Sequence, residues 1–170
     1  MTKRSSNPAD QQPFLPRRIV SGGQTGVDRA GLELAIAHQI QHGGWCPKGR
    51  LSEDGSIPSR YELVEMDTAE YPPRTEQNVI DSDATLILYE QRLKGGTLLT
   101  RRYAARWNKP YLAVAMDSTS PGVVRQWLDQ LRPETLNIAG PRESSFPGIG
   151  DRALAFLLEA FADRSTEVSR

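Results

Sequence analysis

Short apolar runs alternate with longer amphipathic segments along most of this chain. Runs rich in β-branched and aliphatic residues predict strands at residues 17–21, 43–46, 62–66, 84–89, 111–116 and 135–140. Segments with apolar positions at helical spacing predict helices over residues 28–41, 73–82, 97–108, 121–131 and 149–163. Strands that alternate with helices in this way indicate an α/β fold, in which helices flank a mostly parallel sheet.

The two ends of the chain differ from the patterned region between them. Residues 1–16 are mainly polar and offer little apolar surface to bury, so they predict a disordered leader. Residues 165–170 predict a flexible tail. A length of 170 residues suffices for one full α/β core and is too short for two ordinary ones, so residues 17–164 predict a single domain.

Charge and cysteine content narrow the choice of partners and compartment. Lysine and arginine total 21, as do aspartate and glutamate, so the chain lacks the net positive charge that holds long nucleic acids. Cys46 is the single cysteine and has no intramolecular partner for a disulfide. We find neither the apolar core of a signal peptide nor the roughly 20 apolar residues of a membrane helix. The sequence therefore predicts a cytoplasmic protein without a long nucleic acid or a membrane as partner, although a local basic pocket is compatible with the charge balance.

The first predicted strand runs into a glycine-rich turn, "SGGQTGVD". Gly22 and Gly23 remove side chains where the backbone turns, and Gly26 lets the helix begin close to a ligand, which suits a phosphate. A tight turn without a ligand is the alternative. Ser21 replaces the first glycine of the dinucleotide fingerprint, and the loop lacks the lysine of a Walker loop. The second strand leads into Lys48 rather than into an acidic residue that binds a ribose, which disfavours hydride transfer with NAD.

Asp28 lies at the start of the first predicted helix. A carboxylate there is favoured by the helix dipole even without a ligand. Alternatively, it accepts hydrogen bonds from ribose hydroxyls or from the N–H edge of a base or pterin. Because a carboxylate repels a phosphate that touches it, Asp28 and the glycines must address different parts of a ligand.

Two further loops are predicted to offer hydrogen-bond donors to an anion. In "EQRLKGGTLLT", Gly95 and Gly96 precede Thr97, which we expect to cap the following helix. In "AGPRESSFPGIG", Arg142 offers a planar fork of donors that suits a phosphate. The alternatives are a glycine hinge before a capped helix, and an Arg142 side chain that pairs with Glu143 or with solvent.

All three loops follow predicted strands of one parallel sheet, so they should meet at the edge formed by the carboxyl ends of the strands. Three anion-binding loops at one edge favour a single shared ligand over three independent turns. Lys48 and Arg50 follow the second strand and are expected near the same rim, either as ligand contacts or as part of a solvated charged loop.

Five stretches of the chain together resemble a known family. They are "SGGQTGVDRAGLELA", "GWCPKGRLSEDG", "RTEQNVIDSDATLI", "KGGT" and "LNIAGPRESSFPGI". In this order, over residues 17–163, they resemble the molybdenum cofactor carrier proteins, circularly permuted YpsA-type members of the SLOG superfamily. The resemblance implies a Rossmann-like three-layer sandwich, a homo-oligomer, and a ligand over the glycine-rich loops. For the carriers that ligand is molybdenum cofactor (molybdopterin), a phosphorylated pterin, and for the wider superfamily it is a nucleotide-like molecule.

The resemblance also implies binding positions in this chain and a molybdoenzyme that accepts the cofactor. The positions that match the family's loops are Gly22, Gly23, Gln24, Thr25, Gly26, Asp28, Gly95, Gly96, Thr97, Gly140, Pro141, Arg142, Glu143 and Ser144. We therefore expect a binding protein with a phosphate-binding loop, and we add Lys48 and Arg50 as candidate contacts from the neighbouring charged loop.

One departure from the superfamily bears on catalysis. "GGTLLT" resembles a motif of the superfamily members that cleave the N-glycosidic bond of nucleotides, in which a catalytic glutamate follows the glycines and the threonine. Here Thr100 occupies the position of that glutamate. A hydroxyl group cannot serve as a general base near neutral pH, which favours a carrier over an enzyme. Asp28, Glu90 or Glu143 can replace the missing carboxylate, so a hydrolase or transferase that acts on a nucleotide-derived substrate is the alternative.

No metal site is predicted from the residue pattern. His38 and His42 are four residues apart, a spacing that can place two imidazoles on one metal, but no clear third ligand accompanies them. Histidine is also favoured at the end of a helix. Cys46 fits either a small buried residue or a soft metal ligand.

Overall fold

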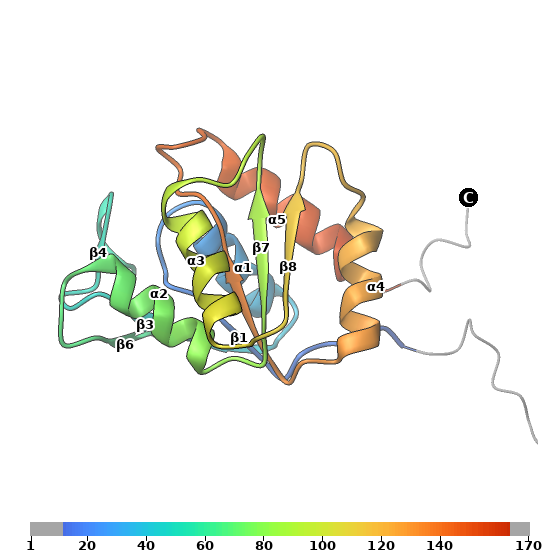
Figure 1. Cartoon of the computed structure of the whole chain (residues 1–170), viewed down its shortest axis with the longest axis horizontal. Helices are drawn as coiled ribbons and strands as arrows, with labels where there is room; N and C mark the ends of the chain where they lie inside the picture. The colour runs from blue at the N-terminus through green and yellow to red at the C-terminus, as the bar shows by residue number, and fades with distance from the viewer. Residues whose placement is uncertain (1–11, 164–170) are drawn as a thin grey trace, which may run out of the picture.

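The computed structural model describes residues 12–163 and shows an α/β fold built on one parallel sheet (Figure 1). The spatial order of the five strands is β2 (Gln41–Gly43), β1 (Arg18–Val20), β9 (Thr135–Ala139), β7 (Ala84–Tyr89) and β8 (Tyr111–Ala115). Each neighbouring pair is parallel, with Ile19 opposite Leu136 and Leu86 opposite Ile138. The predicted parallel sheet is confirmed.

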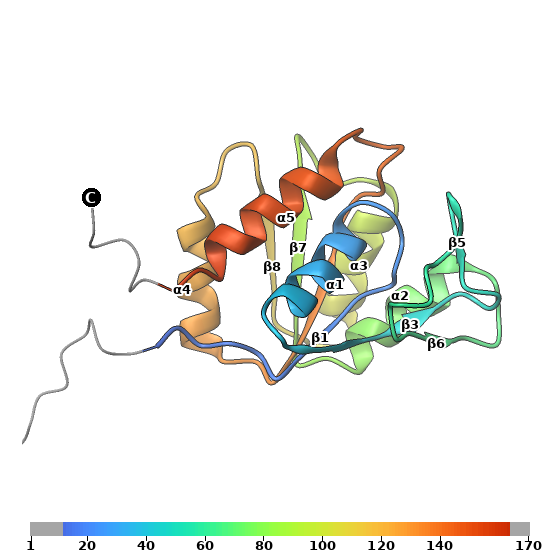
Figure 2. The ribbon, with the colours of Figure 1, turned by 180° about the vertical axis from the view of Figure 1, so that it is seen from behind.

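Helices cover both faces of this sheet. α1 (Val27–Ala37) and α5 (Ile149–Ala160) pack against each other on one face (Figure 2). α3 (Gly95–Arg106) lies on the other face with α2 (Tyr71–Ile80) packed beside it (Figure 1). α4 (Pro121–Leu131) contacts α5 near the β8 edge. The result is the predicted three-layer, Rossmann-like sandwich.

The most apolar run of the sequence forms the most buried strand. In β7 the first five of six residues are buried, because both faces of the strand are covered by helices. Leu86 and Leu88 pack in one cluster with Ile138 of β9, Leu34 of α1 and Leu157 of α5. Full burial of such a side chain contributes about 1.5–3 kcal/mol. This core fixes the ends of the central strands relative to one another.

The chain departs from prediction between the first helix and the second strand. α1 ends at Ala37 rather than at residue 41, because Gln39 adopts a left-handed conformation with φ 54° and β2 follows at once. Gly44 then takes φ 124°, and a side chain there would lie 2.2 Å from the Ser21 carbonyl oxygen. The predicted strand at residues 43–46 is therefore split, and the chain leaves the sheet at Gly44.

Residues 45–65 form two small sheets beside the main one. β3 (Trp45–Cys46) pairs in parallel with β6 (Val64–Glu65), so the predicted strand at residues 62–66 exists but lies outside the main sheet. β4 (Leu51–Ser52) and β5 (Gly55–Ser56) form a hairpin that the pattern does not predict, since strands of two residues show no periodicity. The side chain of Asn78 accepts from the Trp45 N–H (2.8 Å) and donates to the Trp45 carbonyl (3.0 Å), which ties α2 to β3.

Residues 12–16 belong to the folded chain rather than to a disordered leader. The Phe14 N–H donates to the Asp129 carboxylate, the Phe14 carbonyl accepts from Arg125, and the Arg132 guanidinium lies 4.7 Å from the Phe14 ring centre. The leader prediction is therefore wrong for this short stretch. The rest of the predicted leader and the predicted tail at 165–170 lie outside the described residues. Over residues 12–163, none of the helices has the length and apolar character needed to span a bilayer.

Candidate ligand-binding site

A pocket of about 500 Å³ lies at the carboxyl ends of β1, β9 and β7. Its walls come from α2, from the first turns of α3 and from the loops that follow the three strands. The loops converge as predicted because the strands are neighbours in the sheet. The predicted binding residues that line the pocket are Gly22, Gln24, Asp28, Gly95, Gly96, Thr97, Gly140, Pro141 and Arg142.

The loop after β1 is closed on itself rather than open to an anion. The Gly23 N–H donates to the Ser21 hydroxyl oxygen (3.3 Å). The N–H groups of Gln24 and Thr25 donate to the side chains of Asp28 (3.3 Å) and Gln24 (3.0 Å), respectively. A phosphate bound to this loop would have to displace these bonds, so the loop offers an anion fewer free donors than the sequence predicts.

Two glycines of this loop are required by close packing. A side chain at Gly26, where φ is 82°, would lie 2.3 Å from the Pro141 carbonyl oxygen. A side chain at Gly23, where φ is 76°, would lie 2.4 Å from a methyl group of Leu63. The loops after β1 and β9 therefore meet backbone to backbone, and neither Gly23 nor Gly26 lines the pocket.

Asp28 and Arg74 form a buried ion pair on the pocket wall. Each residue is only 7% exposed, and a guanidinium nitrogen of Arg74 lies 3.4 Å from the Asp28 carboxylate. A side chain at Gly22 would lie 1.7 Å from that nitrogen, so the glycine provides the space that the guanidinium occupies. Burial raises the pKa of Asp28, although the positive charge of Arg74 opposes the shift.

The "KGGT" stretch has free space beside its glycines, in contrast to the loop after β1. α3 begins at Gly95 with Lys94 as its N-cap residue, so the predicted cap at Thr97 is wrong: Thr97 lies within the first turn. A side chain at Gly95 or Gly96 would have no neighbouring atom within 4 Å. N–H groups in the first turn of a helix lack intrahelical acceptors and form the positive end of its dipole. Lys94, whose ammonium lies 5.0 Å from the Phe146 ring centre, adds a charge to this side of the pocket.

In the loop after β9, Arg142 lines the pocket and Glu143 does not. One carboxylate oxygen of Glu143 accepts from the Gly148 N–H and the other from the Gly150 N–H (3.1 Å). These bonds satisfy N–H groups at the start of α5, which is an N-capping role. The structure thus engages Glu143 in the fold, away from the position predicted for a ligand contact or a catalytic base.

Glu53, in the turn between β4 and β5, joins this hairpin to two of the loops. Its carboxylate accepts from the Thr25 hydroxyl and from both the N–H and the hydroxyl of Ser144. Arg142 lies 3.6 Å from the same carboxylate. Burial raises the pKa of Glu53, but the hydrogen bonds from Ser144 and Thr25 outweigh it and hold the pKa below its usual value. Thr25 and Ser144, both predicted to contact ligand, contact Glu53 instead and do not line the pocket.

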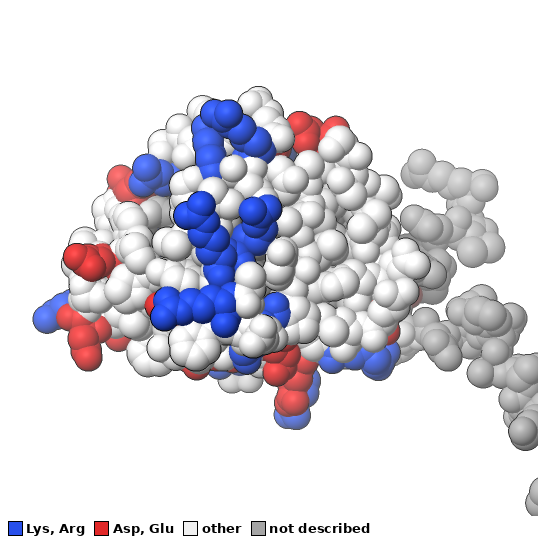
Figure 3. Space-filling model, viewed as in Figure 1, with Lys and Arg blue, Asp and Glu red and all other residues white. Residues whose placement is uncertain are grey.

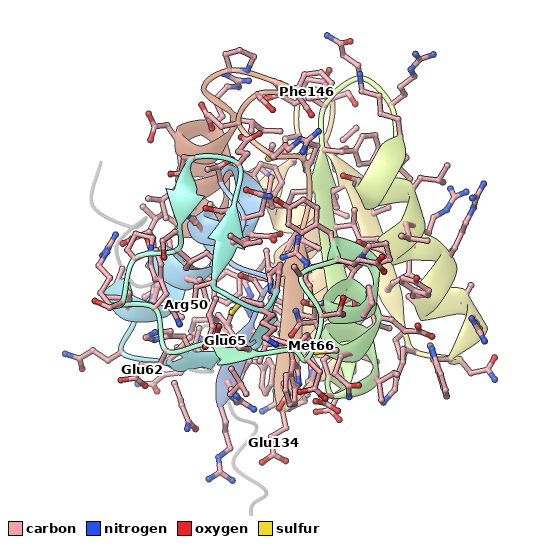
Figure 4. All side chains as sticks on the ribbon, turned by 90° about the vertical axis from the view of Figure 1, so that its left-hand side faces the viewer. Arg50, Glu62, Glu65, Met66, Glu134 and Phe146 are labelled. Atoms are coloured by element: carbon pink, nitrogen blue, oxygen red, sulfur yellow. The ribbon has the colours of Figure 1, made fainter. Side chains whose placement is uncertain are left out.

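Lys48 and Arg50 lie away from the pocket. The Arg50 guanidinium donates to backbone carbonyls of residues 57–61 at 2.8 to 3.2 Å and so holds the chain before β6. Lys48 is exposed and does not line the pocket. Figure 4 shows Arg50 beside Glu65, at the opposite end of the view from the pocket residue Phe146. Their predicted place at the ligand rim is wrong, because the chain turns away from the sheet at Gly44.

The wall that α2 contributes is absent from the sequence prediction. It consists of Tyr71, Pro72, Arg74, Thr75 and Asn78. Arg74 and Asn78 are four residues apart and both are buried, so a pair of polar side chains occupies the buried face of this helix. Buried polar residues at helical spacing are the signal that could have identified this wall.

Among the described residues, Asp28 supplies the one carboxylate that lines the pocket. Glu90 lies outside it and forms a two-pronged pair with Arg152, at 2.6 and 2.9 Å. Thr100 lines the pocket at the place of the superfamily glutamate, but its hydroxyl donates to the Gly96 carbonyl (3.0 Å). General-base chemistry by a carboxylate in this pocket would therefore depend on Asp28.

The three candidate metal ligands, His38, His42 and Cys46, lie in different parts of the fold. His38 follows α1, with its ring 6.1 Å from the Phe161 ring centre, and His42 in β2 accepts from the Glu62 N–H (3.1 Å). Cys46 is a free thiol in a small apolar cluster, where burial raises its pKa. Over residues 12–163, no cluster of three or more histidine, cysteine or acidic side chains is arranged to hold a metal ion.

Basic side chains dominate the pocket and the surface beside it. Three of the four charged side chains that line the pocket are basic. Figure 3 shows lysine and arginine side chains gathered over the α3 side of the molecule, where Arg101, Arg102 and Arg106 are exposed. The zero net charge of the chain therefore conceals a local cationic region next to the pocket.

Comparison with known proteins agrees with the resemblance of the sequence motifs. A family model described as "Circularly permutated YpsA SLOG family" matches residues 19–161. A crystal structure of a "Putative molybdenum carrier protein" from Syntrophus aciditrophicus SB shares 46% sequence identity, covers 89% of this chain and 98% of its own, and superposes with a TM-score of 0.84. No curated protein gives a significant match. The region matched by the family model contains the three loops and the helices that form the pocket.

Proposed function

Because the chain belongs to the circularly permutated YpsA SLOG family, we propose that it is a carrier that binds a phosphorylated pterin, molybdenum cofactor, or a related nucleotide-like ligand. The observation that carries this proposal is the open, cationic pocket at the carboxyl ends of three parallel strands. Its volume of about 500 Å³ falls within the range of roughly 300–1,000 Å³ typical of small-molecule sites.

The phosphate of the ligand binds at the start of α3. Gly95 and Gly96, in the first turn of α3, are exposed and line the pocket, and Lys94 provides a positive charge on the same side of the pocket. Arg142, half exposed and paired loosely with Glu53, can turn to the same anion as a second cation. This site differs from the first glycine loop, in which the N–H groups of Gly23, Gln24 and Thr25 are already bonded within the protein.

The heterocycle of the ligand occupies the remainder of the pocket. Tyr71 and Phe146 line it with aromatic surface, and Leu99 and Pro72 add apolar contacts. Flat rings bind favourably to such surfaces because aromatic side chains bury large apolar areas and stack on other π-systems. Asn137 and Thr97 are buried polar residues in the same lining that can fix the orientation of a ring.

The test is the ligand that the protein carries. The full chain is purified from a host that makes molybdenum cofactor, and native mass spectrometry and metal analysis measure bound pterin and molybdenum. We expect an intact phosphorylated pterin on the wild type and its loss in Lys94→Ala, whereas Arg101→Ala, an exposed α3 arginine outside the pocket lining, keeps it. A protein that neither carries a pterin or nucleotide nor binds added molybdenum cofactor would contradict the proposal.

A carrier must also deliver its cargo. We therefore propose a molybdoenzyme as the acceptor and a homo-oligomer as the working form. Transfer is measured as the activity gained by a cofactor-free molybdoenzyme when the loaded carrier is added, and the oligomer by the mass of the protein in solution. Gain of activity without release of free cofactor supports direct delivery, whereas equal gain through a dialysis membrane refutes it.

A hydrolase or transferase that acts on a nucleotide-derived substrate is the second candidate, and Asp28 is the observation that favours it. This carboxylate lines the pocket, and its burial raises its pKa toward the range useful for acid–base catalysis. Turnover of nucleoside monophosphates to free base and ribose 5-phosphate, abolished by Asp28→Asn, would establish this reading. Recovery of bound nucleoside monophosphates without cleavage would instead favour the carrier function.

A further inference from the structure

We infer that β8, the outer strand of the sheet, pairs in antiparallel direction with β8 of a second copy of this chain, so that the two sheets join across a two-fold axis at Ala113. This inference rests on the homo-oligomer of the proposed function. It adds to that function the surface, the symmetry and the register of the oligomer, and it is independent of the ligand in the pocket.

The outer side of β8 has unused backbone hydrogen-bonding groups. The Pro110 carbonyl accepts from the Thr85 N–H (3.0 Å) and the Met116 N–H donates to the Tyr89 carbonyl (2.9 Å), so the backbone groups of even-numbered residues face β7. Backbone groups alternate in direction along a strand, so those of odd-numbered residues face outward. The outward-facing residues are Tyr111, Ala113 and Ala115. Their N–H groups, and the carbonyls of the first two, have no hydrogen-bond partner among residues 12–163.

β8 lacks the features that protect the edge of a sheet from pairing. It is five residues long, and its sequence YLAVA contains neither a charge nor a proline. At the opposite edge, β2 has three residues, and the chain turns out of the sheet at Gly44 directly afterwards. An exposed apolar edge strand is a template for another strand unless charges, prolines or a covering segment block it. The second sheet is therefore expected at β8.

The surface beside β8 is apolar as well. α4, next to β8 in both ribbon views, has Val123, Trp127 and Leu131 in a row at four-residue spacing (Figures 1 and 2). Val123 is 43% and Leu131 38% exposed, and Tyr111 at the start of β8 is 39% exposed. Figure 3 shows an area with few charged side chains over β8 and α4, bordered by the basic side chains over α3. A continuous apolar face of this kind is typical of an interface between subunits.

The size of this face agrees with that of a stable dimer. The five residues of β8 and the 11 residues of α4 each span about 16 Å. Helices on both faces of a sheet make its edge about 30 Å across, so the flat area is about 500 Å². The accessible area of a rough protein surface exceeds its flat area, which brings the face close to the 800 Å² or so that each subunit contributes to a standard interface.

The charges at the two ends of β8 fit a second copy in antiparallel register. Lys109 precedes the strand and Asp117 follows it, and neither forms an ion pair with any of residues 12–163. With Ala113 opposite its own copy, Lys109 of one copy lies opposite Asp117 of the other. Parallel pairing would instead place like charges together. This charge complementarity favours a second copy over an unrelated extended peptide.

Two kinds of variant test the pairing. Ala113→Pro removes an N–H group that β7 does not use, so it blocks the second copy and leaves the β7–β8 ladder intact. Ala113→Ser keeps that N–H group and is its control. Lys109→Glu and Asp117→Lys each place like charges opposite each other across the axis, and the double variant restores opposite charges. Lys48→Glu, at an exposed lysine outside this face, is the control for charge reversal.

Sedimentation equilibrium of the full chain over a range of concentrations gives the dissociation constant. We expect the wild type to have twice the 18.9 kDa mass of one chain. Ala113→Pro loses both hydrogen bonds of the Ala113 pair and should raise the dissociation constant about thirtyfold or more. Each single charge reversal should raise it about fivefold, and the double variant should return it to within about twofold of wild type. Both controls should match the wild type.

The rescue by the double variant is specific to pairing between copies. Within one chain Lys109 and Asp117 lie at opposite ends of β8, roughly 25 Å apart, so their charges are screened from each other. Urea unfolding shows whether each variant is folded. If Ala113→Pro does not fold, charge reversal and its rescue decide the question.

Three results would overturn the inference. A monomeric wild type at high concentration would also remove the homo-oligomer from the proposed function, yet leave ligand binding in place, since no described residue of β8 or α4 lines the pocket. An oligomer that neither Ala113→Pro nor charge reversal dissociates would be built on another surface and would leave the proposed function standing. Dissociation by the single charge reversals without rescue by the double variant would exclude the antiparallel register.

Discussion

The glycine-rich loops after β1 and β7 contain the same residue type and use it in opposite ways. In the first, Gly22, Gly23 and Gly26 lie so close to other chain segments that a side chain would meet neighbouring atoms at 1.7 to 2.4 Å. In the second, a side chain at Gly95 or Gly96 would stand in open space. A glycine in a loop therefore indicates either a joint between segments or access for a ligand, and only the surrounding structure tells which.

The difference is also the reason why we propose the second loop, and not the first, as the site of the ligand's phosphate. The first loop looks more like a nucleotide-binding motif, yet the N–H groups of Gly23, Gln24 and Thr25 are bonded internally, and the charges of Asp28 and Arg74 beside the loop pair with each other. The second loop opens a helix next to a lysine. Anion binding follows free donors and positive potential rather than glycine count, so the second loop is the better phosphate site.

The largest effect is expected from Gly26→Ala. The added methyl group meets the Pro141 carbonyl oxygen and the backbone has φ 82°, so both packing and conformation oppose it. We expect the free energy of unfolding, measured by urea denaturation, to fall by about 3 kcal/mol or more. Gly122→Ala is the control. A loss no greater than in that control would mean that the loops after β1 and β9 do not meet as closely as described.

Glu143→Gln should have a smaller effect on stability. The substitution weakens two hydrogen bonds from N–H groups of α5 and removes a negative charge from the start of that helix. We expect a loss of about 1–2 kcal/mol in thermal or urea unfolding, with ligand affinity unchanged. Asp151→Asn, an exposed acid in the first turn of the same helix, is the matched control. Lost affinity at full stability would place Glu143 at the ligand after all.

Asp28→Asn should change how stability depends on pH. Because burial raises the pKa of Asp28, the folded protein retains a proton between the unfolded-state pKa, near 4, and the raised value. In that window the free energy of unfolding of the wild type falls as pH rises, whereas the amide of the variant does not titrate. The stability of the variant relative to wild type should therefore rise with pH, by at most about 1.4 kcal/mol per pH unit, in urea unfolding at several pH values.

The opposite dependence of relative stability on pH would mean that a different effect dominates the pKa of Asp28. A relative stability that falls as pH rises would mean that Arg74 lowers the pKa of Asp28 more than burial raises it. Asp151→Asn serves again as a control, since an exposed carboxylate should give a nearly flat difference.

The smallest effect on stability is expected from Gly96→Ala, the counterpart of Gly26→Ala. Nothing lies within 4 Å of the new methyl group, and φ at this position is not positive. We expect unfolding within about 0.5 kcal/mol of wild type. The methyl group enters the pocket beside the proposed phosphate site, so affinity for ribose 5-phosphate should fall in calorimetry. A strong loss of stability would mean that Gly96 is as closely packed as the glycines of the loop after β1, contrary to the structure.

The sequence predicts well those features that depend on local pattern. The apolar run 84–89 forms the buried central strand, and helices occur in each predicted region because their apolar positions repeat at helical spacing. The convergence of the three loops follows from parallel strands alone. The residues with positive φ at Gln39 and Gly44 break that logic: Gln39 ends α1 early, and Gly44 turns the chain out of the sheet where it packs against the Ser21 backbone.

The candidate site is predicted only in part for the same reason. Gly22 and Arg74 are far apart in sequence, and nothing in either local pattern reveals that one makes room for the other. Glu53 likewise engages Thr25 and Ser144 across the fold. Position in a glycine-rich loop predicts proximity to the pocket, but whether a side chain faces the ligand or another loop depends on tertiary contacts.

The departure of the chain from the main sheet at Gly44 has a consequence for how such proteins can diversify. The α2 wall, with Tyr71 and Arg74, belongs to one continuous excursion that rejoins the sheet at β7. The phosphate end that we propose lies on a different part of the chain, at the start of α3. Replacing this contiguous segment would therefore change the α2 side of the proposed ring site and leave the proposed anchoring group and the sheet as they are.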